Sequence, residues 1–578
     1  MGDAGFIGRH DMSNNDLQTF MNVIDRMGEL KPIHTAVSAE LEITEIADRI
    51  SKLHGPALLF TNVEGSKYPV LINTLGSYKR MSLGLGVEKL DDIAADLEEY
   101  FALGNYLSWK GLKKSAPRLR RLLYAIPKKS MSKGECQAVI ERDVNLHTLP
   151  VLKCWPEDAG KFITLPLVFT KDRDSKQQNV GMYRMQILDE KTTGMHWHKH
   201  KDGSEIYKGY AKHKEKMPVS VVLGCDPSIT YSATAPLPKE IDEMMLAGWI
   251  RKSRVKMVKS ITNDIYVPSD AEFVLEGYVD PTEALVLEGP FGDHTGYYSI
   301  ADYYPKFHVT CITHKRNAVY PTTIVGKPPM EDCYMSKATE RIFLPMLRLM
   351  MPELVDLNLP FEGVFHNCAI VSIRNKYPGC ARKIMNSIWG MGQMMYTKLI
   401  IVVDESVDVQ NLTQVREAVL QNVNGLESIV LSEGPLEALD HSSDQALYGS
   451  RLGIDATNVK SYTDRTEVKN TYRFLFIQKE KPWQGKTELE EYMRGHHDKF
   501  VIAVDDTVNP DDLSTIMWRL FNNIDAKRDI TIMDQKIGID ATTKWREEGL
   551  TREWPHDIVM SDEMKKYVDQ RWDEYGIN

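Results

Sequence analysis

The sequence predicts a mixed α/β protein of several domains, with a β-rich middle region between two α/β segments. Three observations lead to this fold class. A chain of 578 residues is longer than one hydrophobic core supports. Strand-like runs separated by Gly, Pro and Asp turns fill residues 135–325. One α/β sequence pattern occurs twice near the C-terminus, which indicates a duplicated unit.

The N-terminal α/β segment is predicted at residues 1–130. Ser13 can cap a helix whose apolar residues recur at helical spacing, namely Leu17, Phe20, Met21, Ile24 and Met27. The short apolar runs PALLF and PVLIN are typical of strands, and they alternate with helical patterns such as LDDIAADLEEYFAL.

The middle domain is predicted at residues 131–330, and its many strands favour a barrel. The runs LPLVFT, MPVSVVLG, AEFVLEGYV and FHVTCITH have the length and composition of strands. The Met- and Leu-rich pattern ATERIFLPMLRLMM that follows indicates a helix, so residues 331–397 are predicted to be a helical linker. We expect its Met stripe to pack in the core.

The C-terminal third contains an internal repeat. KLIIVVDESVDVQNLTQV, beginning at Lys398, matches KFVIAVDDTVNPDDLSTI, beginning at Lys499, at one constant offset. Each copy continues with a helix, a further strand and the phrase GIDAT, so we place the two copies at residues 398–480 and 481–578. Only the first copy contains EALDHSSDQALYGSR, and we expect this loop to approach a functional site while the second copy packs.

Composition excludes several function classes. A net charge of −10 and a pI near 5.9 argue against binding to nucleic acid. The N-terminus lacks the basic and apolar regions of a signal peptide, and the longest apolar runs are too short to span a membrane. Seven cysteines without a CxxC pair suit core thiols in a reducing compartment. We therefore expect a cytoplasmic protein.

The stretch EGPFGDHTGYYS carries two acids, Glu288 and Asp293, on a looped backbone. Pro290 and its neighbouring glycines exclude a regular helix, so a loop must orient both carboxyl groups. No GK[ST] follows the glycines, which excludes a P-loop, and two acids are too few for a calcium loop. Paired carboxylates suit acid/base chemistry, although a plain surface turn has the same pattern.

A second cluster contains His196, His198 and His200, which strand alternation would place on one face. This pattern fits either a three-histidine metal site or a solvated edge strand. A further acid, Glu276, lies in the apolar run VLEGY. A carboxylate in such a strand is costly unless it is paired or bound to a metal.

Several motifs together resemble the UbiD family of decarboxylases that depend on prenylated FMN. They are NVGMYR from Asn179, VLEGY, EGPFGDHTGYYS, MYTKLIIVVD and the C-terminal IGIDATTKW, in the family's order. The motifs look closest to the branch of 4-hydroxy-3-polyprenylbenzoate and menaquinone-pathway decarboxylases. The resemblance implies an α/β N-terminal segment, a split β-barrel that binds the flavin, a helical linker and a C-terminal α/β oligomerisation domain.

The resemblance also implies roles for individual residues. It replaces the three-histidine site by Asn179, His200 and Glu276 as ligands of Mn²⁺, and it suggests K⁺ as a further ion. The implied cofactor-binding residues are Met182, Tyr183, Arg184, His196, Trp197, His198, Lys201, Asp202 and Lys398. This chain has Lys201 and Asp202 where ubiquinone-pathway relatives have Arg-Gly, while Lys499 copies Lys398 and is expected to be structural.

The implied catalytic residues are Arg184, Glu288 and Asp293. Arg184 would bind the substrate carboxylate and keep Glu288 ionised. Asp293, more weakly paired, would deliver a proton to the carbon that loses CO₂. His294 follows directly, and it fits either tuning of that proton or packing.

The predicted function is reversible, non-oxidative decarboxylation of an aromatic acid, most simply a hydroxylated arene of the quinone-precursor type. Its partners would be the acid and CO₂, a flavin prenyltransferase that supplies the cofactor, and further copies of the chain in a dimer or hexamer. A carboxylase working in the CO₂-fixing direction, a non-catalytic flavin-binding subunit and an ordinary FMN oxidoreductase remain alternatives.

Overall fold

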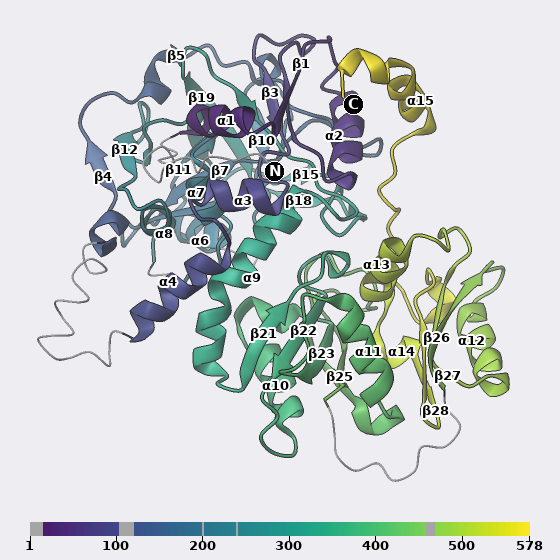
Figure 1. Cartoon of the computed structure of the whole chain (residues 1–578). Coiled ribbons are helices and arrows are strands. Elements are labelled where there is room, and N and C mark those ends of the chain that lie inside the picture. The colour runs from purple at the N-terminus through teal and green to yellow at the C-terminus, as the bar shows by residue number, and fades with distance from the viewer. Residues whose placement is uncertain (1–15, 103–120, 199–201, 239–240, 458–468, 578) are drawn as a thin grey trace, which may run out of the picture. The chain divides into compact units, whose positions relative to one another are not determined.

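The computed structural model describes residues 16–102, 121–198, 202–238, 241–457 and 469–577, and these form two compact units (Figure 1). Unit 1 comprises the described residues of Met1–Gly326, Met330–Thr339 and Asp557–Asn578. Unit 2 comprises those of Lys327–Pro329 and Glu340–His556. The fold class is confirmed as mixed α/β.

Unit 1 begins with the predicted α/β segment. Its sheet has the order β1-β2-β3-β20, formed by Leu30–Ile33, Ala57–Phe60, Val70–Ile72 and Tyr320–Pro321. Its helices are α1 (Leu17–Arg26), α2 (Glu42–Lys52), α3 (Tyr78–Gly84) and α4 (Asp91–Ala102). Asp16 caps α1 by accepting from Thr19 N at 2.7 Å, whereas the predicted cap Ser13 lies outside the described residues.

The centre of unit 1 is an antiparallel sheet in the order β10-β19-β14-β11-β7-β8, with β5 also paired to β19. These strands are Thr192–Gly194, Lys306–His314, Phe273–Val279, Met217–Leu223, Leu167–Lys171, Gln178–Met182 and Val139–Glu141. Among the described residues the pairing follows an open path rather than a closed ring. The antiparallel β-rich domain is therefore present, and its hydrogen bonding does not close a barrel.

Short strand pairs and helices surround this sheet. The pairs are β6 (Phe162–Ile163) with β9 (Met185–Gln186), β15 (Val286–Glu288) with β18 (Asp302–Tyr304), and β16 (Phe291–Gly292) with β17 (Tyr298–Ser299). A third sheet joins β13 (Tyr266–Pro268), β12 (Lys256–Lys259) and β4 (Lys128–Ser130). The helices are α6 (Asp202–His213), α7 (Pro227–Ser232), α8 (Glu243–Ile250) and the C-terminal α15 (Asp562–Arg571). Helix α15 packs on α2, where Tyr575 donates to Glu42 at 2.7 Å.

Unit 2 contains the first α/β copy, which is larger than predicted. Its sheet has the order β21-β22-β23-β25-β24, formed by Leu354–Asn358, Cys368–Ile373, Leu399–Asp404, Tyr448–Asp455 and Ile429–Pro435. Helices α10 (Cys380–Trp389) and α11 (Leu412–Asn422) belong to this copy, and α9 (Glu331–Met350) precedes it. Residues 354–389, predicted as linker, thus supply strands and a helix of this α/β sheet.

The second copy repeats this arrangement without an equivalent of β21. Its sheet has the order β26-β27-β29-β28, formed by Lys469–Ile477, Asp498–Asp505, Lys536–Asp540 and Ile530–Met533. Its helices are α12 (Gln484–Gly495), α13 (Leu513–Asn523) and α14 (Ala526–Asp529). In both copies the GIDAT strand is parallel to the strand that follows the repeated lysine.

The two copies share one apolar cluster and exchange hydrogen bonds reciprocally. Ile370, Leu399 and Val403 of the first copy cluster with Ile502, Phe521 and Ile539 of the second. The Lys398 ammonium donates to Asn522 O, and the Lys499 ammonium donates to Leu420 O in the opposite copy. The second copy therefore packs against the first, and the structural role of Lys499 stays a prediction that this contact fits.

All seven cysteines are buried and unpaired, as expected for core thiols. Within the described residues, no helix has both the length and the apolar character that crossing a membrane requires.

Candidate active site

Arg184, which follows β8, connects three groups of the loop that carries the paired acids. Its Nε donates to Glu288 Oε1 at 3.0 Å, its Nη1 donates to Asp293 Oδ2, and its Nη2 donates to Ser299 Oγ at 3.0 Å. The guanidinium also lies over the Phe291 ring, 4.6 Å from its centroid. The structure thus brings together the three residues predicted to be catalytic.

The acid loop is held by main-chain contacts from a distant segment. Asp158 accepts from Gly292 N at 2.7 Å through one oxygen, and from the backbone of Cys154 and Trp155 through the other. A Cβ on Gly292 would lie 2.4 Å from the Trp155 ring, so this close approach requires glycine. Burial raises the pKa of Asp158 to about 6. Sequence reasoning did not identify Asp158, because the acids in CWPED have no distinctive pattern.

Both acids of the loop are buried, with Glu288 fully buried and Asp293 9% exposed. Burial alone would raise their pKa values, but His196 and Arg184 hold the pKa of Glu288 below its usual range. Arg184 and His294 lower the pKa of Asp293 further. The expectation that Asp293 is the more weakly paired acid is therefore not met here, because it accepts from both neighbours and both carboxyl groups are ionised.

His196 contacts the second oxygen of Glu288. Its Nδ1 lies 2.6 Å from Glu288 Oε2, and its Nε2 lies 2.9 Å from His198 Nε2. The ring also packs on Tyr304, with centroids 4.3 Å apart. Burial and the nearby Arg184 lower the pKa of His196, so the ring is neutral. The two histidines are adjacent as predicted, while His200 and Lys201 lie outside the described residues.

Two of the predicted cofactor-binding residues, Tyr183 and Trp197, lie beside Gly203 near the start of α6. The Tyr183 hydroxyl accepts from Gly203 N at 3.5 Å, and a Cβ on Gly203 would lie 2.6 Å from Trp197 Nε1. Within the described residues, the buried Trp197 Nε1 has no hydrogen-bond acceptor. Met182 ends β8 and is half-buried, and Asp202 begins α6. An unpaired donor beside a helix N-terminus fits an anionic group such as a phosphate.

One of the predicted metal ligands, Glu276, contacts several hydrogen-bond donors. Glu276 on β14 accepts from Ile261 N at 2.9 Å and from the Thr262 amide and hydroxyl at 2.6 and 2.7 Å. These three donors contact both of its oxygens, so a neighbouring loop stabilises this buried carboxylate. The assignment of Glu276 as a metal ligand stays a prediction.

Glu243, at the start of α8, is the carboxylate that lies beside Asn179. Asn179 Nδ2 donates to Glu243 Oε1 at 3.0 Å, and Val180 N donates to Oε2 at 3.1 Å. The Asn179 Oδ1 is buried without a donor, and burial raises the pKa of Glu243 to about 7. An unpaired amide oxygen next to a carboxylate fits a hard divalent cation. The described residues contain no group of three or more His, Cys, Asp and Glu side chains placed to hold a metal.

Lys398, predicted to contact the cofactor phosphate, lies in unit 2 and is 2% exposed. Its ammonium lies 2.8 Å from Asp440 and donates to Ser442 Oγ at 2.7 Å and to Asn522 O at 2.9 Å. Asp440 and Ser442 come from the extra loop of the first copy. Three protein acceptors match the three protons of the ammonium, so contact with a phosphate requires one partner to be displaced.

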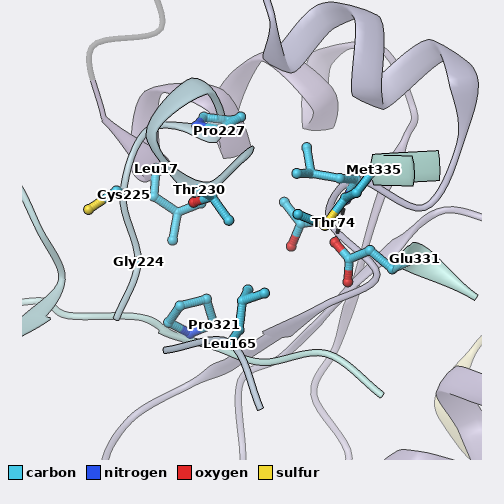
Figure 2. A pocket seen from close by; sticks show the side chains of 11 residues that line it. Leu17, Thr74, Leu165, Gly224, Cys225, Pro227, Thr230, Pro321, Glu331 and Met335 are labelled. Atoms are coloured by element: carbon cyan, nitrogen blue, oxygen red, sulfur yellow. Dashed lines mark hydrogen bonds between the residues drawn. The ribbon is translucent and has the colours of Figure 1, made fainter. Parts of the chain in front are cut away.

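A cavity in unit 1 is lined by none of the predicted site residues (Figure 2). Leu17, Leu165 and Met335 contribute apolar surface, and Glu331 accepts from Leu75 N at 2.6 Å. Thr74 Oγ1 and Glu331 Oε2 have no hydrogen-bond partner. The volume of about 20 Å³ suits a single water and is too small for an aromatic substrate.

Three family models match most of the chain. The N-terminal domain of 3-octaprenyl-4-hydroxybenzoate carboxy-lyase matches residues 21–97, and its Rift-related domain matches residues 128–328. The C-terminal domain matches residues 333–456 and 473–547, which correspond to the two α/β copies.

Individual proteins are similar over comparable lengths. An uncharacterised protein of Archaeoglobus fulgidus is 47% identical over 77% of this chain and 92% of its own length. The vanillic acid decarboxylase of Sedimentibacter hydroxybenzoicus, solved in a closed form, has a TM-score of 0.68 at 27% identity, covering 83% of this chain and 98% of that one. An evolved dimeric form of the UbiD-class enzyme HmfF of Pelotomaculum thermopropionicum, in complex with prFMN, has a TM-score of 0.65 at 21% identity, covering 78% and 97%.

Proposed function

The chain belongs to the UbiD family of carboxy-lyases, and we propose that it reversibly decarboxylates a hydroxylated aromatic acid with the help of prenylated FMN. The observation that supports this function best is the position of Arg184 between Glu288 and Asp293. A buried guanidinium with two terminal N–H groups is suited to bidentate binding of a carboxylate.

In the proposed mechanism the substrate carboxylate accepts from Nη1 and Nη2 of Arg184, which Asp293 and Ser299 occupy in the free protein. The Nε of Arg184 stays with Glu288. Asp293 then loses its strongest partner, so its pKa rises and it can take up a proton. After CO₂ leaves, Asp293 donates this proton to the vacated ring carbon.

Prenylated FMN, when bound, supplies the electron sink that loss of CO₂ from an sp² carbon requires. The donor set supports such a group: Tyr183 and Trp197 lie beside the start of α6, with the Trp197 Nε1 unpaired. For Mn²⁺, Asn179 Oδ1 and Glu243 offer oxygen ligands, and His200 would complete the set. We assign no residues to K⁺.

The proposed substrate class follows from the family and from the similarity to a vanillic acid decarboxylase. Supply of the cofactor by a flavin prenyltransferase, assembly into a dimer or hexamer and a cytoplasmic location stay predictions. Carboxylation in the CO₂-fixing direction uses the same residues, and turnover under high bicarbonate would favour it. The presence of Arg184, Glu288 and Asp293 argues against a non-catalytic subunit.

The test uses protein co-expressed with a flavin prenyltransferase. We expect the mass and spectrum of the extracted flavin to show prenylation, Mn²⁺ to copurify, and CO₂ to be released from hydroxylated aryl acids. Recovery of unmodified FMN alone, with no Mn²⁺ and no CO₂ release across the panel, would refute the proposal. Reduction of the flavin by NAD(P)H would instead indicate an oxidoreductase.

A further inference from the structure

His196 connects Glu288 to a segment of the chain that is distinct from the one carrying Arg184. It follows β10, whereas Arg184 follows β8, and both side chains converge on the same carboxylate. Glu288 is fully buried and His196 is 7% exposed, so bulk water does not compete with this contact. The distance of 2.6 Å is that of a strong hydrogen bond to an ionised acceptor.

The hydrogen-bond pattern fixes the tautomer of His196. An ionised Glu288 only accepts, so His196 Nδ1 must carry the proton that bridges to Oε2. In a neutral ring Nε2 is then an acceptor, and His198 Nε2 lies 2.9 Å away as its donor. Tyr304 packs on the same ring and restricts its orientation.

Glu288 and Asp293 differ in which nitrogen of Arg184 donates a hydrogen bond to them and in the partners of their other oxygens. Glu288 Oε1 is held by Arg184 Nε, and its Oε2 is held by His196. Asp293 Oδ1 accepts from His294, but its Oδ2 has Arg184 Nη1 as its partner. When a carboxylate takes the two terminal nitrogens of Arg184, only Asp293 gains a free oxygen that can carry a proton.

We propose that His196 is a positioning residue that keeps Glu288 ionised by occupying its second oxygen, so that Asp293 becomes the acid. This inference rests on the proposed decarboxylase function. It attributes the different protonation of Glu288 and Asp293 to the imidazole of His196. Without the Nδ1–H of His196, a proton can bind Glu288 Oε2, and the site contains two competing acids.

The expected consequence is a shift in the pH profile. The charged and titratable groups that face this pair are Arg184, Asp293, Tyr304, His198 and, opposite Glu288 on β18, Asp302. His198 also loses its hydrogen bond to His196 when this residue is changed, so the test compares variants that each keep one of the two contacts. Removal of a hydrogen bond to an ionised group should move the acid limb of kcat/KM for CO₂ release upward by roughly one to two pH units.

A pair of amide variants separates the hydrogen bond from the ring. In His196→Asn the amide nitrogen takes the position of Nδ1 and can still donate to Glu288. In His196→Gln the amide takes the position of Nε2, which faces His198 instead. We expect H196N to keep the wild-type acid limb and H196Q to show the shift, with kcat/KM measured per bound flavin in both.

Infrared difference spectra supply a readout that does not require turnover. The H196Q-minus-wild-type spectrum should contain a protonated carboxylic acid band that the H196N-minus-wild-type spectrum lacks, and adding Glu288→Gln to H196Q should remove this band. Equal acid limbs in all three proteins, or equal shifts in H196N and H196Q, would overturn the role of His196. Absence of CO₂ release from wild type would contradict the proposed function instead, and the infrared result would still decide whether His196 keeps Glu288 ionised.

Discussion

Glu276 and Glu243 are the two candidate metal-binding carboxylates. Replacing each by glutamine should show which one stabilises the fold and which one binds the metal. Glu276 accepts three hydrogen bonds from Ile261 and Thr262 and is fully buried. A glutamine at position 276 has one oxygen that can still accept these bonds. Its amide NH₂ replaces the other oxygen and faces a backbone N–H, which is also a donor. The loss of a charged hydrogen bond together with one unpaired N–H should lower the free energy of unfolding by about 3–5 kcal/mol.

Glu243→Gln should have the opposite effect. Its pKa is raised to about 7 from an ordinary 4.5, so the folded state binds the proton more tightly than the unfolded state. The protonated form of Glu243 therefore adds to the free energy of unfolding at low pH. This contribution is lost as pH rises through 7. At pH 8 the metal-free protein bears a cost of about 3 kcal/mol for ionising Glu243, which a glutamine avoids.

The assay combines urea unfolding of the metal-free variants at pH 8 with Mn²⁺ analysis of the flavin-loaded ones. We expect Glu243→Gln to be as stable as wild type or more stable and to lose Mn²⁺. Glu276→Gln should be destabilised, while its folded fraction retains Mn²⁺. The proposed assignment of Glu243 as the metal-binding carboxylate fails if Glu276→Gln keeps wild-type stability and loses Mn²⁺, while Glu243→Gln binds Mn²⁺ normally.

Three further predictions concern the paired acids and their guanidinium. Asp293→Asn should retain flavin and lose about 10²–10⁴-fold in the rate of CO₂ release, and an unchanged rate would exclude Asp293 as the donor. Arg184→Lys should raise KM for the aryl acid by at least about tenfold, since an ammonium cannot bind a carboxylate bidentately; an unchanged KM would contradict this binding mode. Glu288 has a lowered pKa, so wild type should lose stability as pH falls below about 4.5. Glu288→Gln should reduce that slope in urea unfolding between pH 6 and 3, because Asp293 still contributes to it, and equal slopes would contradict the pairing.

Much of the fold could be predicted from the sequence, because the repeat and the strand-like runs are local signals. The boundaries of the copies could not be predicted. The strands after Lys398 and Lys499 match residue by residue, whereas β22 and β26 precede the match and share only an apolar character. Parallel pairing of β22 with β23 is a tertiary contact that no local pattern reveals.

The hydrogen bonds that stabilise Glu276 could not be predicted from the sequence. A carboxylate in an apolar strand needs compensation, and sequence reasoning considered a charged partner or a metal. The structure supplies a third solution, in which the backbone of Ile261 and the backbone and hydroxyl of Thr262 solvate it. Glu243 was missed because an acid in the first turn of a helix is ordinary for reasons of dipole and capping.

The three residues proposed to be catalytic illustrate what a motif can predict and what it cannot. Arg184, Glu288 and Asp293 were assigned by resemblance, and the structure brings them together. The difference between the two acids lies in single oxygen atoms, because Oε2 of Glu288 has His196 and Oδ2 of Asp293 has only Arg184. Sequence assigns residue types, whereas proton transfer depends on which oxygen becomes free when the substrate binds. The proton donor is therefore determined by the partners of each carboxylate, and those partners come from strands far apart in the chain.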